Sequence, residues 1–301
     1  MTWKKLPLAK FFEMAKTPVV WITGADGFTG RYLVDALRQK NYTVITTVVD
    51  ITDPEQVAKT VKSIKPDYII NLAGISFVPE GADASVYAVN TLGPTYILEA
   101  CLELATPPTK IILASSANIY GSQQQASIDE TCIANPVNHY GCSKWAMEQL
   151  AKNYSDRLDI LMTRPFNYTG VGQSERFLVP KIIAHIKHKK QSIRLGNIDI
   201  WRDFSDVRWV VEAYIRLMEK PDISGVVNLC SGRLTSISDI LEHAQKVAGT
   251  TISVVADPAL MRQTDIARQC GNNHRLFELV PEMPSPPAFE ETLNWMMTGS
   301  D

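Results

Sequence analysis

The amino-acid sequence predicts an α/β protein built on a doubly wound parallel sheet, with a smaller C-terminal lobe. Short apolar segments alternate with amphipathic helical segments from residue 18 onward, and a glycine-rich turn joins the first of these pairs. The 301 residues are enough for a large core. Strands that alternate with helices form βαβ units, which give parallel sheets covered on both faces.

The first half of the chain supplies five strands and the helices between them. Each expected strand is a short run of mostly apolar residues, and each expected helix repeats its apolar residues every three or four positions. We expect strands at 18–24, 42–49, 67–74, 110–116 and 159–167, and helices at 27–41, 53–66, 89–104 and 139–150.

After Asn167 the alternation is less regular. The proline-rich stretch 281–287 has the composition of a surface connection before a last helix. In this half we expect helices at 177–190, 203–220 and 236–249, and strands at 192–196 and 225–232. These elements predict a smaller lobe interleaved with the end of the first.

Composition narrows the classes of partner. The formal net charge of −2 gives no global attraction to nucleic acid or to an anionic membrane, so we expect a small-molecule partner. No apolar run approaches the roughly 20 residues that a membrane span requires. The cysteines show no CxxC pair and no neighbouring histidine set, which predicts neither a metal site nor a disulfide framework and suits a cytoplasmic protein. They are Cys101, Cys132, Cys142, Cys230 and Cys270.

The segment "ITGADGFTGRYL" places Gly24, Gly27 and Gly30 between the first strand and the first helix. Glycines at such a turn let the backbone approach a pyrophosphate, and the N-terminus of the following helix favours its negative charge. Glycines can also mark a simple turn. The combination of strand, glycine loop and helix predicts dinucleotide binding.

The segment "HYGCSKWAMEQL" places Tyr140 and Lys144 four residues apart on a predicted helix, where their side chains share one face. One interpretation is a partly buried tyrosine beside a lysine whose amine reaches solvent. The other is a proton donor whose pKa is lowered by a nearby cation, as acid-base catalysis at neutral pH requires.

Together, the glycine loop, "NLAG", "ILASSANIYG" and the Tyr-x-x-x-Lys pair resemble the extended short-chain dehydrogenase/reductase family over residues 18–297. The resemblance implies a Rossmann-type sheet and a nicotinamide cofactor, NADP(H) or NAD(H). It implies that Tyr140 is the proton donor, that Lys144 binds the nicotinamide ribose and lowers the tyrosine pKa, and that Ser116 rather than Ser115 binds the substrate oxygen.

The same resemblance implies which residues contact the cofactor. Asp50 and Ile51 resemble an Asp-hydrophobe pair that contacts adenine, although Asp53 could instead cap a helix and leave Asp50 merely exposed. The usual helix and third strand are nearly absent here, and no acidic or basic residue ends the second strand at Thr46 or Thr47, so NAD and NADP both stay open. The implied cofactor set is Gly24, Gly27, Phe28, Thr29, Gly30, Asp50, Ile51, Leu72, Ala73, Gly74, Tyr140, Lys144 and Pro165.

The second half resembles the sugar-nucleotide branch of that family, most closely the GDP-mannose 4,6-dehydratase and GDP-4-keto-6-deoxy-mannose reductase group. Arginine forks and a lysine charge suit a diphosphate, although any one of these cations could be a solvated surface charge. The resemblance implies that the substrate is bound by Ser76, Ser116, Asn167, Lys181, Arg202, Arg262 and Asp265.

Two positions separate the reactions of this branch. By resemblance, a dehydratase has a glutamate where this chain has Asn118. GDP-fucose synthase has a cysteine there, and a histidine where this chain has Phe177. We therefore expect reduction of an existing C4 ketone, with GDP-4-dehydro-6-deoxy-D-mannose going to GDP-D-rhamnose. The alternatives are a GDP-6-deoxy-talose or heptose product, a nucleotide-sugar 4-epimerase, and a non-catalytic dinucleotide-binding regulatory subunit.

The predicted organisation is an N-terminal extension at 1–17, a dinucleotide-binding domain at 18–170 to which some later segments return, and a mainly substrate-binding lobe at 171–301. The family resemblance implies a homodimer formed by the helices that hold 95–103 and 143–150. Their apolar stripes could equally belong to the core.

Overall fold

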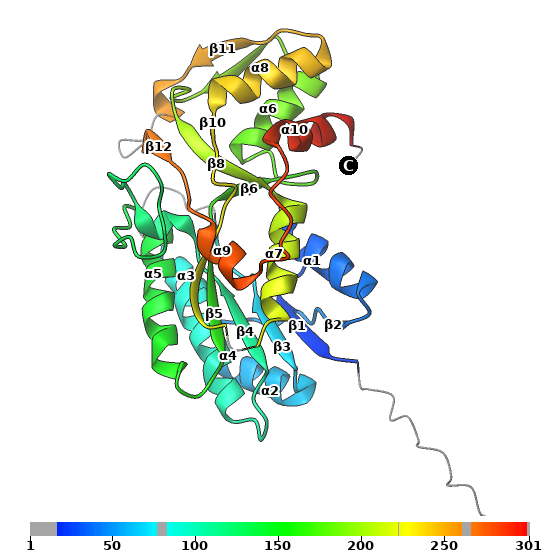
Figure 1. The fold of residues 1–301 in the computed structure, drawn as a ribbon, viewed down its shortest axis with the longest axis vertical. Coiled ribbons are helices and arrows are strands. Elements are labelled where there is room, and N and C mark those ends of the chain that lie inside the picture. The colour runs from blue at the N-terminus through cyan, green and yellow to red at the C-terminus, as the bar shows by residue number, and fades with distance from the viewer. Residues whose placement is uncertain (1–16, 77–82, 222, 261–265, 300–301) are drawn as a thin grey trace, which may run out of the picture.

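Six parallel strands form the central sheet of the molecule (Figure 1). The computed structural model describes residues 17–76, 83–221, 223–260 and 266–299. The strand order is β2-β1-β3-β4-β5-β9. The predicted α/β class with a Rossmann-type sheet is confirmed. The strands are β1 (Val19–Thr23), β2 (Thr43–Ile45), β3 (Tyr68–Asn71), β4 (Lys110–Ala114), β5 (Ile160–Pro165) and β9 (Gly225–Leu229).

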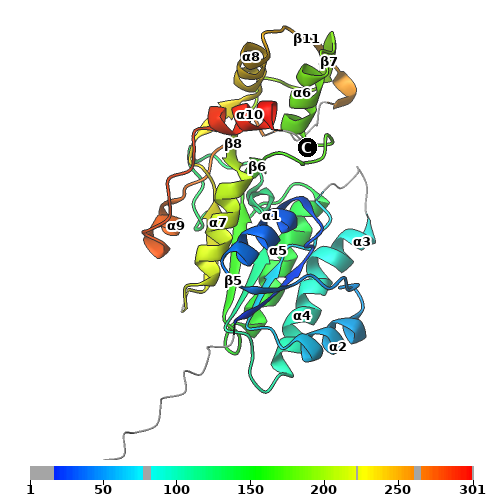
Figure 2. The ribbon, with the colours of Figure 1, turned by 90° about the vertical axis from the view of Figure 1, so that its right-hand side faces the viewer.

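Helices cover both faces of this sheet (Figure 2). Successive side chains of a strand point to opposite faces. Val20 and Ile22 of β1 therefore pack in one core cluster, with α1 (Phe28–Gln39) and α7 (Val207–Met218), whereas Trp21 packs in the other. The second cluster is formed with α2 (Pro54–Ile64), α4 (Gly93–Leu102) and α5 (His139–Ala151). Burial on both faces explains why the strand sequences are almost continuously apolar.

The edge of the sheet at β2 is short. The strand expected at 42–49 is regular only over Thr43–Ile45, and residues 46–53 lead to α2 with neither a helix nor a strand between. Asp53 begins α2 by accepting hydrogen bonds from the backbone N–H groups of Glu55 (3.0 Å) and Gln56 (3.1 Å). The outermost strand of the usual doubly wound order is thus missing on this side.

The expected helix at 89–104 has an irregular start. The short helix α3 (Ala84–Tyr87) runs into a π-helical turn, η1 (Ala88–Leu92), before α4 begins at Gly93. Single π turns inside helices often occur at functional sites. This one carries Asn90, which is fully buried.

The second lobe contains the described strands and helices that belong neither to the central sheet nor to the helices packed on it. Strands β10 and β12 flank β8, which also pairs with β6, while β7 pairs with β11. Helices α6, α8 and α10 share one core cluster. The elements are β6 (Asn167–Thr169), α6 (Leu178–Lys187), β7 (Ser192–Leu195), β8 (Trp201–Asp206), β10 (Leu234–Ser236), α8 (Ile237–Ala248), β11 (Ser253–Ala256), β12 (Arg268–Gln269) and α10 (Phe289–Thr298).

The helix predicted at 203–220 was placed too early. Residues 203–206 are the end of β8, and α7 begins at Val207. Asp206 accepts a hydrogen bond from the backbone N–H of Arg208 (2.8 Å) and so caps the helix. Asp203 points instead into the lobe, where its carboxylate binds backbone groups of two other segments.

Segments beyond residue 170 contribute to the central sheet. Strand β9 is its sixth strand, α7 covers one face, and the short helix α9 (His274–Leu279) packs beside β9. Among the described residues, no helix is long and apolar enough to span a bilayer. Residues 1–16 of the predicted extension lie outside the described residues.

Candidate active site

The glycine loop lies at the carboxyl end of β1, against the end of β3. Gly24 has a φ of +71°, and a Cβ there would lie 2.7 Å from the backbone nitrogen of Ala73. A Cβ on Gly30 would lie 2.6 Å from the Cα of Ala25. Both positions therefore require glycine, the first for its backbone conformation and both for the close approach of main chains. The result is a loop of bare backbone at the edge where such sheets bind ligands.

Helix α1 begins directly after this loop. Its N-cap is Gly27, which has no side chain with which to cap the first N–H groups. Uncapped N–H groups and the positive end of the helix dipole suit a diphosphate. The Thr29 hydroxyl lies 2.8 Å from the Tyr168 hydroxyl, and the Phe28 ring stacks on the Tyr168 ring at 6.2 Å. The loop geometry fits the phosphates of a dinucleotide.

The predicted adenine pair lies at the β2 edge. The Asp50 carboxylate is exposed and accepts hydrogen bonds from the Thr52 backbone N–H (2.9 Å) and hydroxyl (2.7 Å), which lower its pKa. Ile51 is buried, and its side chain lies against Gly93 of α4. Asp53 caps α2 and Asp50 is exposed, which is the alternative that the sequence also allowed, and Ile51 belongs to the core. The contact of this pair with adenine stays a prediction.

Leu72, Ala73 and Gly74 follow β3 and lead toward the lysine. A Cβ on Gly74 would lie 3.2 Å from the Lys144 ammonium nitrogen. The backbone of Ile75 is held by Asn90, whose side-chain oxygen accepts from the Ile75 N–H (2.8 Å) and whose amide donates to the Ile75 carbonyl (3.0 Å). The π turn thus fixes the strand end that faces Lys144.

Lys144 lies on α5 with its side chain only 3% exposed. Its ammonium donates a 2.7 Å hydrogen bond to the Ala114 carbonyl at the end of β4. Burial lowers the pKa of Lys144 to about 8, because it disfavours the charged form, and the negative charge of Glu148 partly opposes the shift. A lysine with these properties can bind a polar ligand and titrate near neutral pH.

Tyr140 lies one turn earlier on α5, beside Ser116. Burial raises the pKa of Tyr140 to about 12, whereas a side-chain hydrogen bond with Ser116 lowers it. The lowering by Lys144 that the family resemblance implies stays a prediction. Ser116 is 5% exposed, and its Oγ accepts from the backbone and side-chain nitrogens of Asn118, each at 3.1 Å. In the described structure the buried Ser115 hydroxyl has no partner, so the contacts favour Ser116 as the serine that meets Tyr140.

The predicted substrate residues are less closely gathered. Asn167 is exposed and donates to the Asp203 carbonyl (3.2 Å), Arg202 donates to the Trp201 carbonyl (2.9 Å), and Lys181 donates to the Arg194 carbonyl (2.7 Å) on the far lobe. Ser76 is exposed after β3, and Pro165 ends β5. Arg262 and Asp265 lie outside the described residues.

A protein-family model described as GDP-mannose 4,6 dehydratase matches residues 45–295. The chain belongs to the GDP-mannose 4,6-dehydratase family. It is 31% identical to a GDP-6-deoxy-D-talose 4-dehydrogenase of Aggregatibacter actinomycetemcomitans and 31% identical to a GDP-6-deoxy-D-mannose reductase of Pseudomonas aeruginosa. In each case the alignment covers 87% of this chain and 90% of the relative.

A solved structure of the Pseudomonas aeruginosa protein RMD, complexed with NADPH, is similar over 94% of this chain and 98% of that one, with 28% identity and a TM-score of 0.85. The predicted family, and with it the prediction of an enzyme, is confirmed. The predicted nicotinamide cofactor agrees with the NADPH bound to that relative.

Two buried polar residues that hold the surrounding backbone were missed by the sequence analysis. Asn90 is buried in the π turn, and its amide also donates to the Ser143 hydroxyl (3.1 Å) on α5. Asp203 is fully buried and accepts from Ser231 N (2.8 Å), Gly232 N (2.9 Å) and Gly271 N (3.2 Å). Asn90 is a polar residue within a mostly apolar stretch of sequence, which was a signal for it, since buried polar groups need partners. Asp203 has charged and polar neighbours in the sequence and carried no such signal.

A buried polar network lies one turn beyond Lys144. The Arg164 guanidinium binds both oxygens of Glu148, at 3.0 and 2.7 Å, and donates to the Tyr120 hydroxyl at 2.9 Å. Tyr120 in turn donates to the Asn228 side chain (2.7 Å) on β9. The network joins α5, β5, β9 and the turn η2 (Ala117–Tyr120), which follows Ser116. It therefore fixes the elements that carry the candidate catalytic residues.

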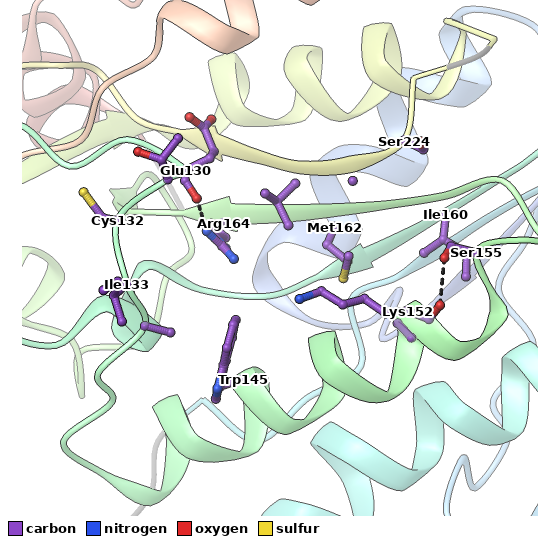
Figure 3. A pocket seen from close by; sticks show the side chains of 15 residues that line it. Glu130, Cys132, Ile133, Trp145, Lys152, Ser155, Ile160, Met162, Arg164 and Ser224 are labelled. Atoms are coloured by element: carbon purple, nitrogen blue, oxygen red, sulfur yellow. Dashed lines mark hydrogen bonds between the residues drawn. The ribbon is translucent and has the colours of Figure 1, made fainter.

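A cavity of about 530 Å³ lies beside this network, and Arg164 is one of its lining residues (Figure 3). It is lined mainly by apolar groups, among them Trp145 of α5 and Met162 of β5, and Lys152 and Glu130 also face it. Ser116, Tyr140 and Lys144 are not among its lining residues. This cavity is therefore separate from the candidate active site, which the glycine loop and the carboxyl ends of the strands define.

The cysteines are spread over several elements of the fold. All five are free thiols. Within the described ranges, no group of three or more His, Cys, Asp or Glu side chains could hold a metal ion.

Proposed function

We propose that the protein reduces the C4 ketone of a nucleotide-activated 6-deoxy-4-keto sugar with NADPH or NADH. The preferred reaction converts GDP-4-dehydro-6-deoxy-D-mannose into GDP-D-rhamnose. One arrangement of side chains carries the proposal. Ser116 contacts Tyr140, and Tyr140 lies on α5 one helical turn before Lys144. The side chain that donates to Ser116 is the amide of Asn118.

Reduction needs a hydride for C4 and a proton for O4. A bound nicotinamide dinucleotide supplies the hydride. Ser116 donates a hydrogen bond to O4, and Tyr140 gives O4 its phenolic proton as the carbonyl electron pair moves onto that oxygen. Lys144 binds the ribose next to the nicotinamide, and its charge stabilises the phenolate left on Tyr140. With this proton and the supplied hydride, the ketone would become an alcohol.

The residues near Ser116 argue against the other reactions of the family. A 4,6-dehydratase must protonate a departing hydroxyl, and the Asn118 amide has no proton to give up at neutral pH. Its side-chain nitrogen already donates to Ser116. At the position where GDP-fucose synthase has a histidine, Phe177 offers only an apolar ring, 37% exposed at the start of α6. Hydride transfer to an existing ketone remains.

Cofactor choice stays open between NADPH and NADH. Thr47 is exposed and Thr46 is partly exposed just beyond β2. Neither carries the acid that would bind a free ribose 2′-hydroxyl or the arginine that would bind a 2′-phosphate. NADPH is bound by the similar RMD structure, which supports testing it first.

A second product, GDP-6-deoxy-D-talose, has equal support from relatives. The talose dehydrogenase and the mannose reductase are both 31% identical to this chain. The two products differ in C4 configuration, which depends on the face of the ketone that meets the nicotinamide. A heptose analogue of the substrate would use the same catalytic groups.

The test follows absorbance at the reduced-nicotinamide band while purified protein meets NADPH or NADH and GDP-4-dehydro-6-deoxy-D-mannose formed in place by a dehydratase. We expect stoichiometric loss of the band, and proton NMR of the product gives the C4 configuration. Folded protein that consumes neither cofactor would contradict the proposal. Tightly retained cofactor with sugar interconversion would indicate a 4-epimerase, and cofactor binding without any turnover would indicate a regulatory subunit.

A homodimer formed by α4 and α5 also stays a prediction. Tyr96 of α4 and Trp145 of α5 are partly exposed apolar side chains on these two helices, which pack beside each other on one face of the sheet. They are compatible with a helical interface between two copies of the chain.

A further inference from the structure

The hydroxyl of Ser116 is held by a single neighbouring residue. Its Oγ accepts from the backbone N–H of Asn118 at 3.1 Å and from the side-chain amide of Asn118 at 3.1 Å. Ser116 is 95% buried at the start of η2, whereas the Asn118 side chain is exposed. The two donors reach the serine from one side, which is the side of the turn.

A serine hydroxyl has one proton to donate and two lone pairs to accept with. When both lone pairs are occupied by N–H groups, the hydroxyl can only donate, and its proton points away from both donors. The turn of residue 118 packs against Gly141 of α5, the neighbour of Tyr140, and the Tyr140 phenol interacts with the Ser116 side chain, so the phenol is the group that this proton meets. Burial raises the pKa of Tyr140, and the interaction with Ser116 acts to lower it.

The backbone of residue 118 is itself fixed against the catalytic helix. A Cβ on Gly141, the residue after Tyr140, would lie 2.7 Å from the Asn118 carbonyl oxygen and 3.2 Å from its carbonyl carbon. Glycine at 141 therefore lets the turn rest directly on the first turn of α5. The position of the Asn118 backbone N–H relative to α5 is therefore set by main-chain packing.

We infer that Asn118 is a positioning residue that directs the Ser116 hydroxyl proton toward the oxygen that Tyr140 protonates. This inference rests on the proposed reduction. Ser116 then acts as a permanent donor, so the site favours an oxygen that accepts two hydrogen bonds. A ketone oxygen does so, and it gains strength as an acceptor when negative charge develops on it.

A carboxylate at 118 would reverse this arrangement. In Asn118→Asp the side chain accepts where the amide donated, so the Ser116 proton turns toward residue 118 and away from Tyr140. Asn118→Leu removes the amide without adding charge and leaves the backbone N–H in place, so a smaller loss is expected. Asn138→Asp makes the same amide-to-carboxylate change at the N-cap of α5, where Oδ1 accepts from Gly141 N (2.8 Å) and an aspartate can do the same.

The experiment is a double-mutant cycle of Asn118→Asp with Ser116→Ala, read as kcat for ketone reduction. We expect Asn118→Asp to lower kcat about 10²-fold, the lower end of the loss from removing one transition-state donor. Ser116→Ala should lower kcat at least as much, and the double variant should fall no further than Ser116→Ala. Asn138→Asp should change kcat less than about 3-fold, since its hydrogen bond is preserved.

A second readout needs no substrate. The ¹³C chemical shift of the Tyr140 Cζ, assigned by its loss in Tyr140→Phe, reports the hydrogen bond from Ser116 in each folded variant at pH 7.5. We expect Asn118→Asp to shift this signal in the direction of Ser116→Ala, with no added shift in the double variant. Failure of the wild-type reduction would remove the proposed function, while the NMR cycle would still decide the role of Asn118.

The inference is overturned if the two substitutions multiply in kcat, because Asn118 would then act on the substrate without Ser116. It is also overturned if the Tyr140 signal in Asn118→Asp equals that of the wild type, or if Asn138→Asp shifts it as much, since nearby charge alone would then account for the effect.

Discussion

Helix α5 buries ionisable groups at two successive turns, and the two turns treat them differently. At the first of these two turns, the Lys144 ammonium has one hydrogen bond within the described part of the chain, to the Ala114 carbonyl. At the next turn, both oxygens of Glu148 are bound by the Arg164 guanidinium. The Lys144 ammonium therefore has further N–H donors available for a ligand, whereas the Glu148 carboxylate is fully paired.

The difference shows in the pKa values. Burial lowers the pKa of Lys144 to about 8. Burial also acts to lower the pKa of Arg164, but the hydrogen bonds and charge of Glu148 raise it above its ordinary value. A buried charge with a full set of partners is structural, whereas one with spare donors and a pKa lowered toward neutrality is available for a ligand. Burial alone does not distinguish the two.

Tyr140→Phe should give the largest effect, a loss of kcat with little change in cofactor binding or folding. Removing a positioned proton donor typically costs about 10²–10⁴-fold in rate, so kcat should fall by that factor. The phenol makes no buried ion pair, so folding should be nearly unchanged. The measurement is kcat beside cofactor affinity from nicotinamide fluorescence. Near-normal turnover would remove Tyr140 as the donor.

Glu148→Ala should act in the opposite way, on stability. Removing one partner leaves the Arg164 charge buried and uncompensated, which typically costs about 3–5 kcal/mol of unfolding free energy. Urea unfolding measures the loss. Lys152→Ala is the matched control, because Lys152 follows α5 at an exposed position and its substitution should stay within about 0.5 kcal/mol. Equal effects of the two variants would contradict the structural role of the pair.

The smallest expected effect is a slope in stability with pH. Lys144 has a pKa of about 8 in the folded protein against an ordinary value of 10.5, so between about pH 8 and 10 the unfolded chain binds more protons. Its contribution to the free energy of unfolding therefore rises with pH in that range. Lys144→Met should flatten the slope, as urea unfolding at pH 7.5, 8.5 and 9.5 would show. An unchanged slope would mean that Lys144 is not the group responsible.

The sequence was sufficient for the central sheet and its glycine loop. The alternation of strands and helices follows from burial on two faces, and Gly24 and Gly30 follow from the close approach of main chains. Tyr140 and Lys144 were found from their spacing on one helix, and Ser116 was found from the family resemblance. Their roles in catalysis remain for the experiments above.

Features set by distant contacts were not predictable. Asp203 is in a strand because its carboxylate binds the backbone of residues 231, 232 and 271, which are far away in the sequence. The apolar periodicity of residues 203–220 is that of a helix whether or not those distant partners are present. Likewise, the π turn around Asn90 depends on where Ile75 and Ser143 lie. Local periodicity contains neither kind of information.

At residue 118 the fold constrains the main chain but not the side chain. Its main chain is pressed against Gly141, yet its side chain is exposed and forms no part of a core cluster. Loss of its single side-chain hydrogen bond would cost only about 1 kcal/mol of stability. The molecule can therefore exchange the group beside its catalytic serine almost independently of folding. A lineage built on this scaffold could change the reaction it performs through one substitution and still retain a stable protein.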